Sequence, residues 1–158
     1  MDFREAIEVI LKHEGGYVND PVDPGGETNM GISKRAYPDL DIKGLTKQSV
    51  REIYYKDYWL KGKCPQVPDE LRLIFFDMVV NMGKSRAVKI LQKSVSAKGI
   101  KTTVDGGIGP QTISNTLKSG LEPERLRSYR VKYYADLVNR KPSLEKYWFG
   151  WYRRATQV

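Results

Sequence analysis

Residue types that carry familiar chemistry are scarce in this sequence of 158 residues. It has one cysteine, Cys64, so no disulfide can form within the chain. Its one histidine, His13, argues against a zinc site built from protein ligands. The pair His13-Glu14 begins like the HExxH zinc motif, but Tyr17 stands where the second histidine would be. We therefore expect neither a metal nor a cofactor.

Long apolar runs and a secretory leader are also missing. No stretch approaches the roughly 20 apolar residues that span a bilayer. The first residues, MDFREAIEVILKHE, contain four acids and so do not resemble the positively charged start of a signal peptide. We expect the chain to remain in the cytoplasm of the host cell until another agent releases it.

Charge is present in quantity and is unevenly distributed. Residues 1–50 hold 6 basic and 9 acidic side chains, residues 51–100 hold 10 and 5, and residues 101–158 hold 11 and 5. The net charge of +8 favours polyanionic partners such as nucleic acid, anionic lipid or the bacterial envelope. Charge alone does not choose among these classes.

Apolar spacing predicts a mainly α fold. A first helix, capped by Asp2 with Glu5, should stop at Gly15-Gly16. Further helices are expected from a Thr46 cap, over 69–83, over 88–99, over 110–120, from Pro123, and around 144–151. The length fits one domain. Residues 17–45, rich in proline, glycine, asparagine and aspartate, predict turns and a short irregular or β element.

A glutamate at the end of the first helix is the leading catalytic candidate. Glycoside hydrolysis needs a carboxylic acid on one side of the scissile bond and a second carboxylate on the other. The acid must keep its proton near neutral pH, which requires a partly apolar setting. Glu14 is suitably placed, and the glycines after it leave room for a sugar. Its partner could be Asp20, Asp23 or Glu27, although aspartates before prolines are also ordinary turn residues.

The stretch HEGGYVNDPVDPGGETNMGIS, residues 13–33, resembles the signature of glycoside hydrolase family 108, a group of phage endolysins and bacterial muramidases. The resemblance implies a lysozyme-like fold, with Glu14 as the catalytic acid and the glycan of peptidoglycan as substrate. More loosely, the order of residues is similar to that of phage-type lysozymes. That likeness implies catalytic roles for Asp23 and Thr28, with Gly31 as the glycine that follows, and it favours inversion at the anomeric carbon.

The second half of the chain also resembles this family. FDMVVNMGKSRAVKILQKSV and DGGIGPQT are similar to a part of the family described as peptidoglycan-binding. We therefore divide the single domain into a catalytic part, 1–85, and a helical part, 86–158. The resemblance makes Asn81, Gln92, Asp105 and Thr112 candidates for lining or bracing the sugar cleft.

Aromatic residues are plentiful, with 10 tyrosines and 3 tryptophans. Tyr54, Tyr129, Tyr133 and Trp148 occupy helical positions where core packing explains them. Tyr17, directly after the glycines, is the one we place near the substrate.

Other functional classes stay open. A nucleic-acid-binding protein would suit the basic helix after Pro123, but its charges are interspersed with acids, and the glycine-rich loop would have no role. A non-catalytic wall-binding module would not need Glu14. Among enzymes, a lytic transglycosylase would cleave the same bond without water, and a chitinase would act on a neutral glycan. We favour a monomeric muramidase acting on peptidoglycan at the cell wall, with no nucleic-acid partner. Its basic C-terminal half would contact the anionic envelope.

Overall fold

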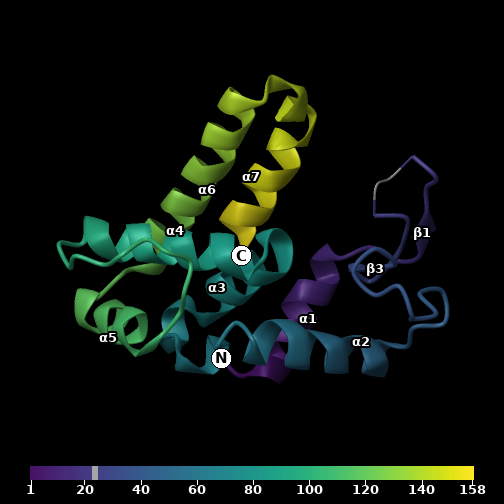
Figure 1. The fold of residues 1–158 in the computed structure, drawn as a ribbon, viewed down its shortest axis with the longest axis horizontal. Helices are drawn as coiled ribbons and strands as arrows, with labels where there is room; N and C mark the ends of the chain where they lie inside the picture. Colours follow the sequence, from purple (N-terminus) through teal and green to yellow (C-terminus); the bar gives the residue numbers. More distant parts are fainter. Residues whose placement is uncertain (23–24) are drawn as a thin grey trace. The chain divides into compact units, whose positions relative to one another are not determined.

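The computed structural model describes residues 1–22 and 25–158, in which the chain forms two compact units. The first comprises Asp2–Asp57, and the second comprises Met1 together with Tyr58–Val158. Seven α-helices and one small antiparallel sheet run through the described ranges (Figure 1). The mainly α, lysozyme-like fold class is therefore confirmed.

The first unit begins with helix α1 (Phe3–His13) and ends after helix α2 (Lys47–Ile53). Asp2 caps α1 by accepting a hydrogen bond from the Glu5 backbone, and the Glu5 side chain accepts one from the Asp2 backbone in return. Thr46 and Ser49 form the same kind of reciprocal cap at α2. Both caps satisfy backbone donors that a helix start leaves without partners. The caps expected at Asp2 and Thr46 are confirmed.

Between these helices lies a three-stranded antiparallel sheet in the order β1 (Val18–Asn19), β2 (Glu27–Asn29), β3 (Ile32–Ser33). Its register pairs Val18 with Thr28, and Asn29 with Ile32. The last pair leaves only two residues for the turn between β2 and β3. The β element expected within 17–45 is thus a very short sheet with one tight hairpin.

The second unit is a helical assembly. The π-helical segment η1 (Tyr54–Leu60) spans the boundary between the units, and a 3₁₀ segment, η2 (Cys64–Gln66), follows. The helices are α3 (Asp69–Met82), α4 (Lys84–Ala97), α5 (Pro110–Ser119), α6 (Pro123–Arg140) and α7 (Trp148–Gln157), with 3₁₀ segment η3 (Pro142–Tyr147) before the last. Pro110 and Pro123 each open a helix, where their missing N–H costs nothing.

Helix α3 supplies most of the apolar centre of the second unit and packs against α4 and α6. The buried side chains of these three helices are mainly aliphatic and aromatic: Leu71, Ile74, Phe75, Phe76, Met78, Val79, Ala87, Val88, Leu91, Val95, Leu126 and Tyr134. Helix α6 also packs along α7, and Tyr134 stacks on Trp151 with ring centroids 4.9 Å apart. The long helix α6 therefore joins the centre to the C-terminal helix.

One buried carboxylate connects three of these helices. Asp77 of α3 is fully buried and accepts a hydrogen bond from Nη2 of Arg130 on α6 at 2.6 Å. Its other oxygen accepts one from Nη2 of Arg154 on α7 at 2.9 Å. Arg130 is itself fully buried, and its Nε and Nη1 have no hydrogen-bond partner among the described residues. The pairing is needed because an uncompensated charge in such a place is very costly.

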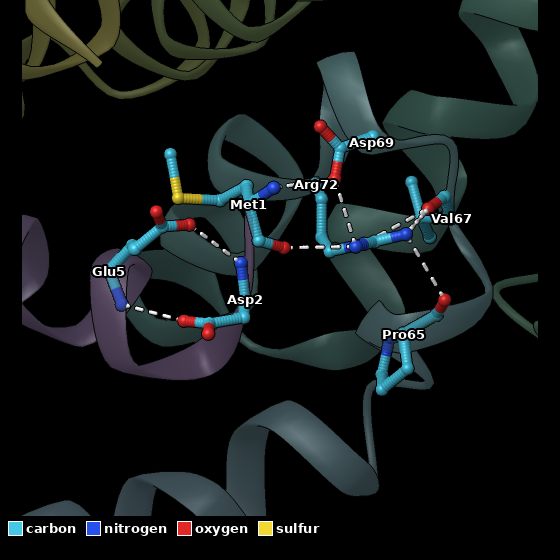
Figure 2. A network of polar contacts seen from close by, with 7 residues as sticks. All are labelled: Met1, Asp2, Glu5, Pro65, Val67, Asp69 and Arg72. Atoms are coloured by element: carbon cyan, nitrogen blue, oxygen red, sulfur yellow. Dashed lines mark hydrogen bonds and ion pairs between the residues drawn. The ribbon is translucent and has the colours of Figure 1, made fainter.

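Met1 belongs to the second unit through two contacts with α3 (Figure 2). Its ammonium lies 2.6 Å from Oδ1 of Asp69, and its carbonyl accepts a hydrogen bond from Arg72. The ammonium holds the pKa of Asp69 below its usual range by donating this hydrogen bond. Arg72 also donates to the carbonyls of Pro65 and Val67 and so holds the end of η2 at the start of α3.

Candidate active site

Glu14 is the first residue after α1. Its backbone is extended, with φ −91° and ψ 136°, while its N–H still donates to the Ile10 carbonyl at 3.2 Å. The helix therefore ends at His13, so Glu14 follows its last turn and does not lie within it. Gly15 and Gly16 follow, and added Cβ atoms there would meet nothing within 4 Å. The chain beyond Glu14 is open to solvent, as the glycine pair predicts.

The hairpin turn between β2 and β3 sits beside this helix end. Its two residues, Met30 and Gly31, both have left-handed backbones, with φ of 48° and 82°. Positive φ at both central positions is typical of the type I′ turn, whose twist suits a two-residue hairpin. The N–H of Met30 donates to the Gly15 carbonyl at 3.0 Å, and its carbonyl accepts from the Tyr54 hydroxyl at 3.0 Å. The first bond fixes the turn against the segment that follows Glu14, and the second fixes it against η1.

Gly31 is where the carboxyl of Glu14 meets the turn. A methyl group on Gly31 would lie 2.9 Å from both Cδ and Oε2 of Glu14, closer than real carbon contacts allow. It would also overlap the hydroxyl of Tyr54. The backbone at Gly31, the Glu14 carboxyl and the Tyr54 hydroxyl thus share one small volume. The absence of a side chain at position 31 is what permits this approach.

Glu14 lines an open pocket of about 440 Å³ within the first unit. The other lining residues come from the C-terminal half of α1, the glycine pair, the end of β2 with the hairpin turn, and α2: Glu8, Leu11, Lys12, Gly15, Gly16, Asn29, Met30, Lys47 and Arg51. Asn29 is buried, and its side-chain amide donates to the Ile42 carbonyl at 3.0 Å. This bond holds the Asn29 side chain in place, and four of the other lining residues are charged.

The charges at this pocket are of mixed sign. Glu8 and Arg51 form an ion pair at 2.6 Å, while Lys12 and Lys47 add two further cations. Glu14 is half-buried. Such a pocket presents two carboxyl groups to a polar chain that enters from solvent. Glu8 is held in its ion pair, and Glu14 is the one placed to assist cleavage as an acid.

Asp23, the predicted partner of Glu14, lies outside the described residues. The other two acidic candidates are engaged in their own loop: Asp20 accepts a hydrogen bond from the Val22 N–H at 2.9 Å, and Glu27 accepts one from the Tyr17 hydroxyl at 2.7 Å. The bond to Glu27 raises the pKa of the Tyr17 hydroxyl, because the carboxylate favours its protonated form. Tyr17 is exposed beside β1, and its contact with substrate stays a prediction.

Thr28 occupies the middle of β2. Asn29, its neighbour, lines the Glu14 pocket, and successive side chains of a strand point to opposite faces. Thr28 is not among the residues that line the described part of that pocket. The structure thus does not bring its side chain together with Glu14, and its predicted role stays a prediction.

The candidates in the second unit form two polar clusters. Gln92 is buried on α4; its amide donates to Asp105, to Thr112 and to the Gly107 carbonyl, and accepts from the Asp105 and Gly106 backbones. The hydrogen bond from Gln92 lowers the pKa of Asp105. Gln92 therefore holds the loop before α5 in place, which favours bracing over direct sugar contact. Substrate contact by Gln92 and Asp105 stays a prediction.

Asn81 lies on α3 and is half-buried. Its Oδ1 accepts a hydrogen bond from the Tyr134 hydroxyl of α6. Burial raises the pKa of Tyr134, so this hydroxyl stays a donor. Asn81 thus connects two helices of the second unit, and its contact with substrate is likewise still a prediction.

Two residues of the site are not predicted by the sequence. Tyr54 was interpreted as core, which its ring is, but its hydroxyl reaches the hairpin turn 24 residues earlier in the chain. Asn29 stands inside the motif without a role having been assigned to it. The sequence signal for Asn29 was an asparagine directly before a turn, because Met30 and Gly31, which follow it, both have left-handed backbones.

Metal and membrane chemistry find no support in the parts of the chain that are described. No group of three or more histidine, cysteine, aspartate or glutamate side chains could hold a metal ion there. None of the helices within those parts has the length and apolar character to span a membrane.

A mainly α chain that presents a helix-end glutamate to an open pocket, beside a small sheet, has the features of a lysozyme-like glycoside hydrolase. Residues 7–83 match the family described as Glycosyl hydrolase 108, and residues 86–156 match the family described as Predicted Peptidoglycan domain. The solved structure of Brucella abortus SagA is similar at 30% sequence identity and a TM-score of 0.78, covering 98% of this chain and 90% of that one. No curated protein matches.

The chain belongs to the glycosyl hydrolase 108 family. Its two family regions together indicate a muramidase-like protein that degrades peptidoglycan. The second region begins at residue 86, where the predicted helical part begins, while the two compact units divide at Asp57 and Tyr58. A single domain with its internal division after residue 85 stays a prediction.

Proposed function

We propose that this protein is a muramidase that hydrolyses the β-1,4 bond between N-acetylmuramic acid and N-acetylglucosamine, with Glu14 as general acid. The observation that supports this most is the close approach of the Glu14 carboxyl to the backbone of Gly31, beside an open pocket that Glu14 lines. The two hydrogen bonds of Met30 hold the turn beside this carboxyl, which supports the assignment. Family membership supplies the substrate class.

In the proposed reaction, Glu14 gives its proton to the glycosidic oxygen as the bond to the anomeric carbon breaks. A water oxygen bonds to that carbon from the opposite face, and Asp23 takes the proton that the water loses. This route inverts the anomeric configuration. We further propose that the enzyme is released from the cytoplasm of the host cell to reach the wall, and that it acts as a monomer.

The test compares Glu14→Gln with the wild type on purified peptidoglycan, by loss of turbidity. Glutamine keeps the shape of the side chain but has no proton to donate. The expected rate falls by about 10²–10⁴-fold, which is the usual contribution of a general acid. Full activity of this variant would show that the catalytic assignment is wrong.

Glu52→Gln is the matched control, because Glu52 is an exposed glutamate on α2 in the same unit and does not line the Glu14 pocket. It should retain the wild-type rate. Asp23→Asn should be strongly impaired if Asp23 receives the proton from water.

A lytic transglycosylase is the main alternative, since it would use Glu14 on the same bond. In that reaction the C6 hydroxyl of the muramic acid replaces water and leaves a 1,6-anhydro end. Mass spectrometry of the soluble products separates the two reactions. Reducing ends support hydrolysis, whereas anhydro ends would replace the hydrolase by the transglycosylase.

A further inference from the structure

Helices α4 and α6 pack against each other and border an open pocket of about 760 Å³ in the second unit. Every residue that lines it lies on one of these two helices. On α4 the lining positions are 86, 89, 90 and 93, and on α6 they run from 129 to 140 at spacings of three and four. Such spacings define one face of each helix, so the pocket is a groove between two continuous stripes.

The groove is strongly cationic. Five basic side chains line it, against a single acid, Asp136. The basic residues are Arg86, Lys89, Lys93, Lys132 and Arg140. All five are exposed, and none forms a salt bridge within the described ranges. Elsewhere on α6 the pattern differs, because Arg125 and Arg127 pair with glutamates. The groove therefore holds an unneutralised positive charge that attracts anions.

Apolar surface lies between these charges. Ile90 is buried at the base, and Tyr129, Tyr133 and Leu137 are half-buried along the α6 side. The ammonium of Lys132 lies 5.9 Å from the centre of the Tyr129 ring. A ligand that fits must therefore offer apolar groups as well as negative charge.

The length of the groove limits the ligand further. From Arg86 to Lys93 the helix rises by about 10 Å, at 1.5 Å per residue. An extended peptide of four residues spans at most about 14 Å. A short peptide with several carboxylates could therefore reach cations at both ends of the α4 stripe, and its side chains could lie on the tyrosines.

We propose that this groove binds the peptide stems of peptidoglycan through their carboxylates. This inference rests on the proposed function, which makes the wall the substrate. A stem peptide combines carboxylates, alanine methyl groups and, where it contains diaminopimelate, a free ammonium. The cations of the groove suit the carboxylates, the tyrosines suit the methyl groups, and Asp136 suits the ammonium. A uniform phosphate polymer would offer nothing to Asp136 or to the apolar base.

The experiment measures binding of the free tetrapeptide L-Ala-D-Glu-diaminopimelate-D-Ala by calorimetry at low salt. The peptide has no glycosidic bond, so catalysis cannot affect the result. The test variant is Lys89→Gln with Lys93→Gln, and the matched control is Lys101→Gln with Lys118→Gln. Both control lysines are exposed in the second unit and lie outside the groove. Each double variant removes two positive charges.

We expect the groove variant to bind the peptide about tenfold more weakly and the control variant to bind it within about twofold of wild type. The same peptide with amidated carboxyl groups should bind as weakly to wild type as the acid peptide does to the groove variant. Equal binding by the two double variants would overturn the proposal, as would equal binding of the acid and amidated peptides. Binding of a glycerol-phosphate polymer in place of the peptide would overturn it too.

The Glu14→Gln protein separates the two proposals. It should bind the tetrapeptide as the wild type does, because Glu14 lies in the other unit. Normal binding with unchanged wall hydrolysis by Glu14→Gln would refute the catalytic role alone. If Glu14→Gln no longer hydrolyses the wall and no variant binds the peptide, only the proposal about the groove is refuted.

Discussion

At position 31 the backbone passes so close to the Glu14 carboxyl that no side chain fits between them. Two separate demands meet at this residue. The type I′ turn requires a positive φ, and the approach of Glu14 and Tyr54 requires the space that a Cβ would fill. Glycine meets both demands, and other residues fail at least one.

Gly31→Ala should therefore lower activity on peptidoglycan by about 10²-fold, because a displacement of about 1 Å at a catalytic group costs this much. Gly26→Ala is the matched control: Gly26 also has a positive φ, of 68°, but among the described residues the nearest atom to an added Cβ is 4.0 Å away. Both variants carry the backbone strain, and only Gly31→Ala disturbs Glu14. Turbidity rates and thermal midpoints are measured for both. Equal activities would mean that contact with Glu14 is not what position 31 provides.

At the scale of elements, the caps and breaks of the helices were predictable from the sequence because they depend on neighbouring residues. Asp2 with Glu5, Thr46, Pro110 and Pro123 each act within one helical turn. The π-helical segment η1 was not predicted, because its wider hydrogen-bond spacing has no apolar period of its own. The glycine pair likewise predicted that the first helix ends close to Glu14.

The rest of the site depends on contacts distant in sequence. Nothing near Tyr54 indicates that its hydroxyl donates to Met30, since helical spacing assigns the ring to the core and says nothing of the hydroxyl. Asp77 is similar: the sequence around it predicts helix, whereas its partners Arg130 and Arg154 come 53 and 77 residues later. Periodicity locates elements and does not identify such partners.

The junction of α3, α6 and α7 gives the element-scale prediction. Asp77→Asn removes the negative charge and leaves two arginines facing an amide, so it should destabilise the fold by about 3–5 kcal/mol. Urea unfolding followed by circular dichroism measures the change. Asp136→Asn, the same substitution at an exposed position of α6, should leave the midpoint nearly unchanged. A similar small effect at Asp77 would mean that the ion pairs contribute little.

Across the whole molecule, charge divides between the two compact units. Residues 2–57 carry 8 basic and 11 acidic side chains, and the remaining residues carry 19 and 8. The proposed catalytic pocket thus lies in the acidic unit, and the cationic groove lies in the basic one. Under the proposed function, the basic unit would supply a long-range attraction to an anionic wall, and the acidic unit would carry the acid.

The one thiol of the chain reports on the integrity of the second unit. Cys64 is fully buried, and this burial raises the pKa of its thiol to about 12. Iodoacetamide at pH 8 should react with it slowly in the native protein and rapidly in urea, because the thiolate is the reactive form. Mass spectrometry follows the reaction. Rapid labelling without urea would show that the second unit opens readily.

The raised pKa of Cys64 also gives stability a pH dependence. The folded protein keeps its thiol proton up to about pH 12, whereas the unfolded chain loses it near 9.0. The unfolded state therefore binds fewer protons between these values, and stability falls as pH rises through this window. Cys64→Ala should remove this contribution to the alkaline decline measured by urea unfolding. An identical decline in the variant would assign it to other groups.

The conformation of Met30 bears on which substitutions this pocket can accept. Its backbone is held in a left-handed conformation by hydrogen bonds that any residue except proline could make, and Met30 lines the proposed active pocket. Asparagine adopts that conformation at less cost. Position 30 is thus a place where evolution, or a mutant library, can reshape the pocket wall with little effect on the acid, whereas position 31 next to it permits no such freedom.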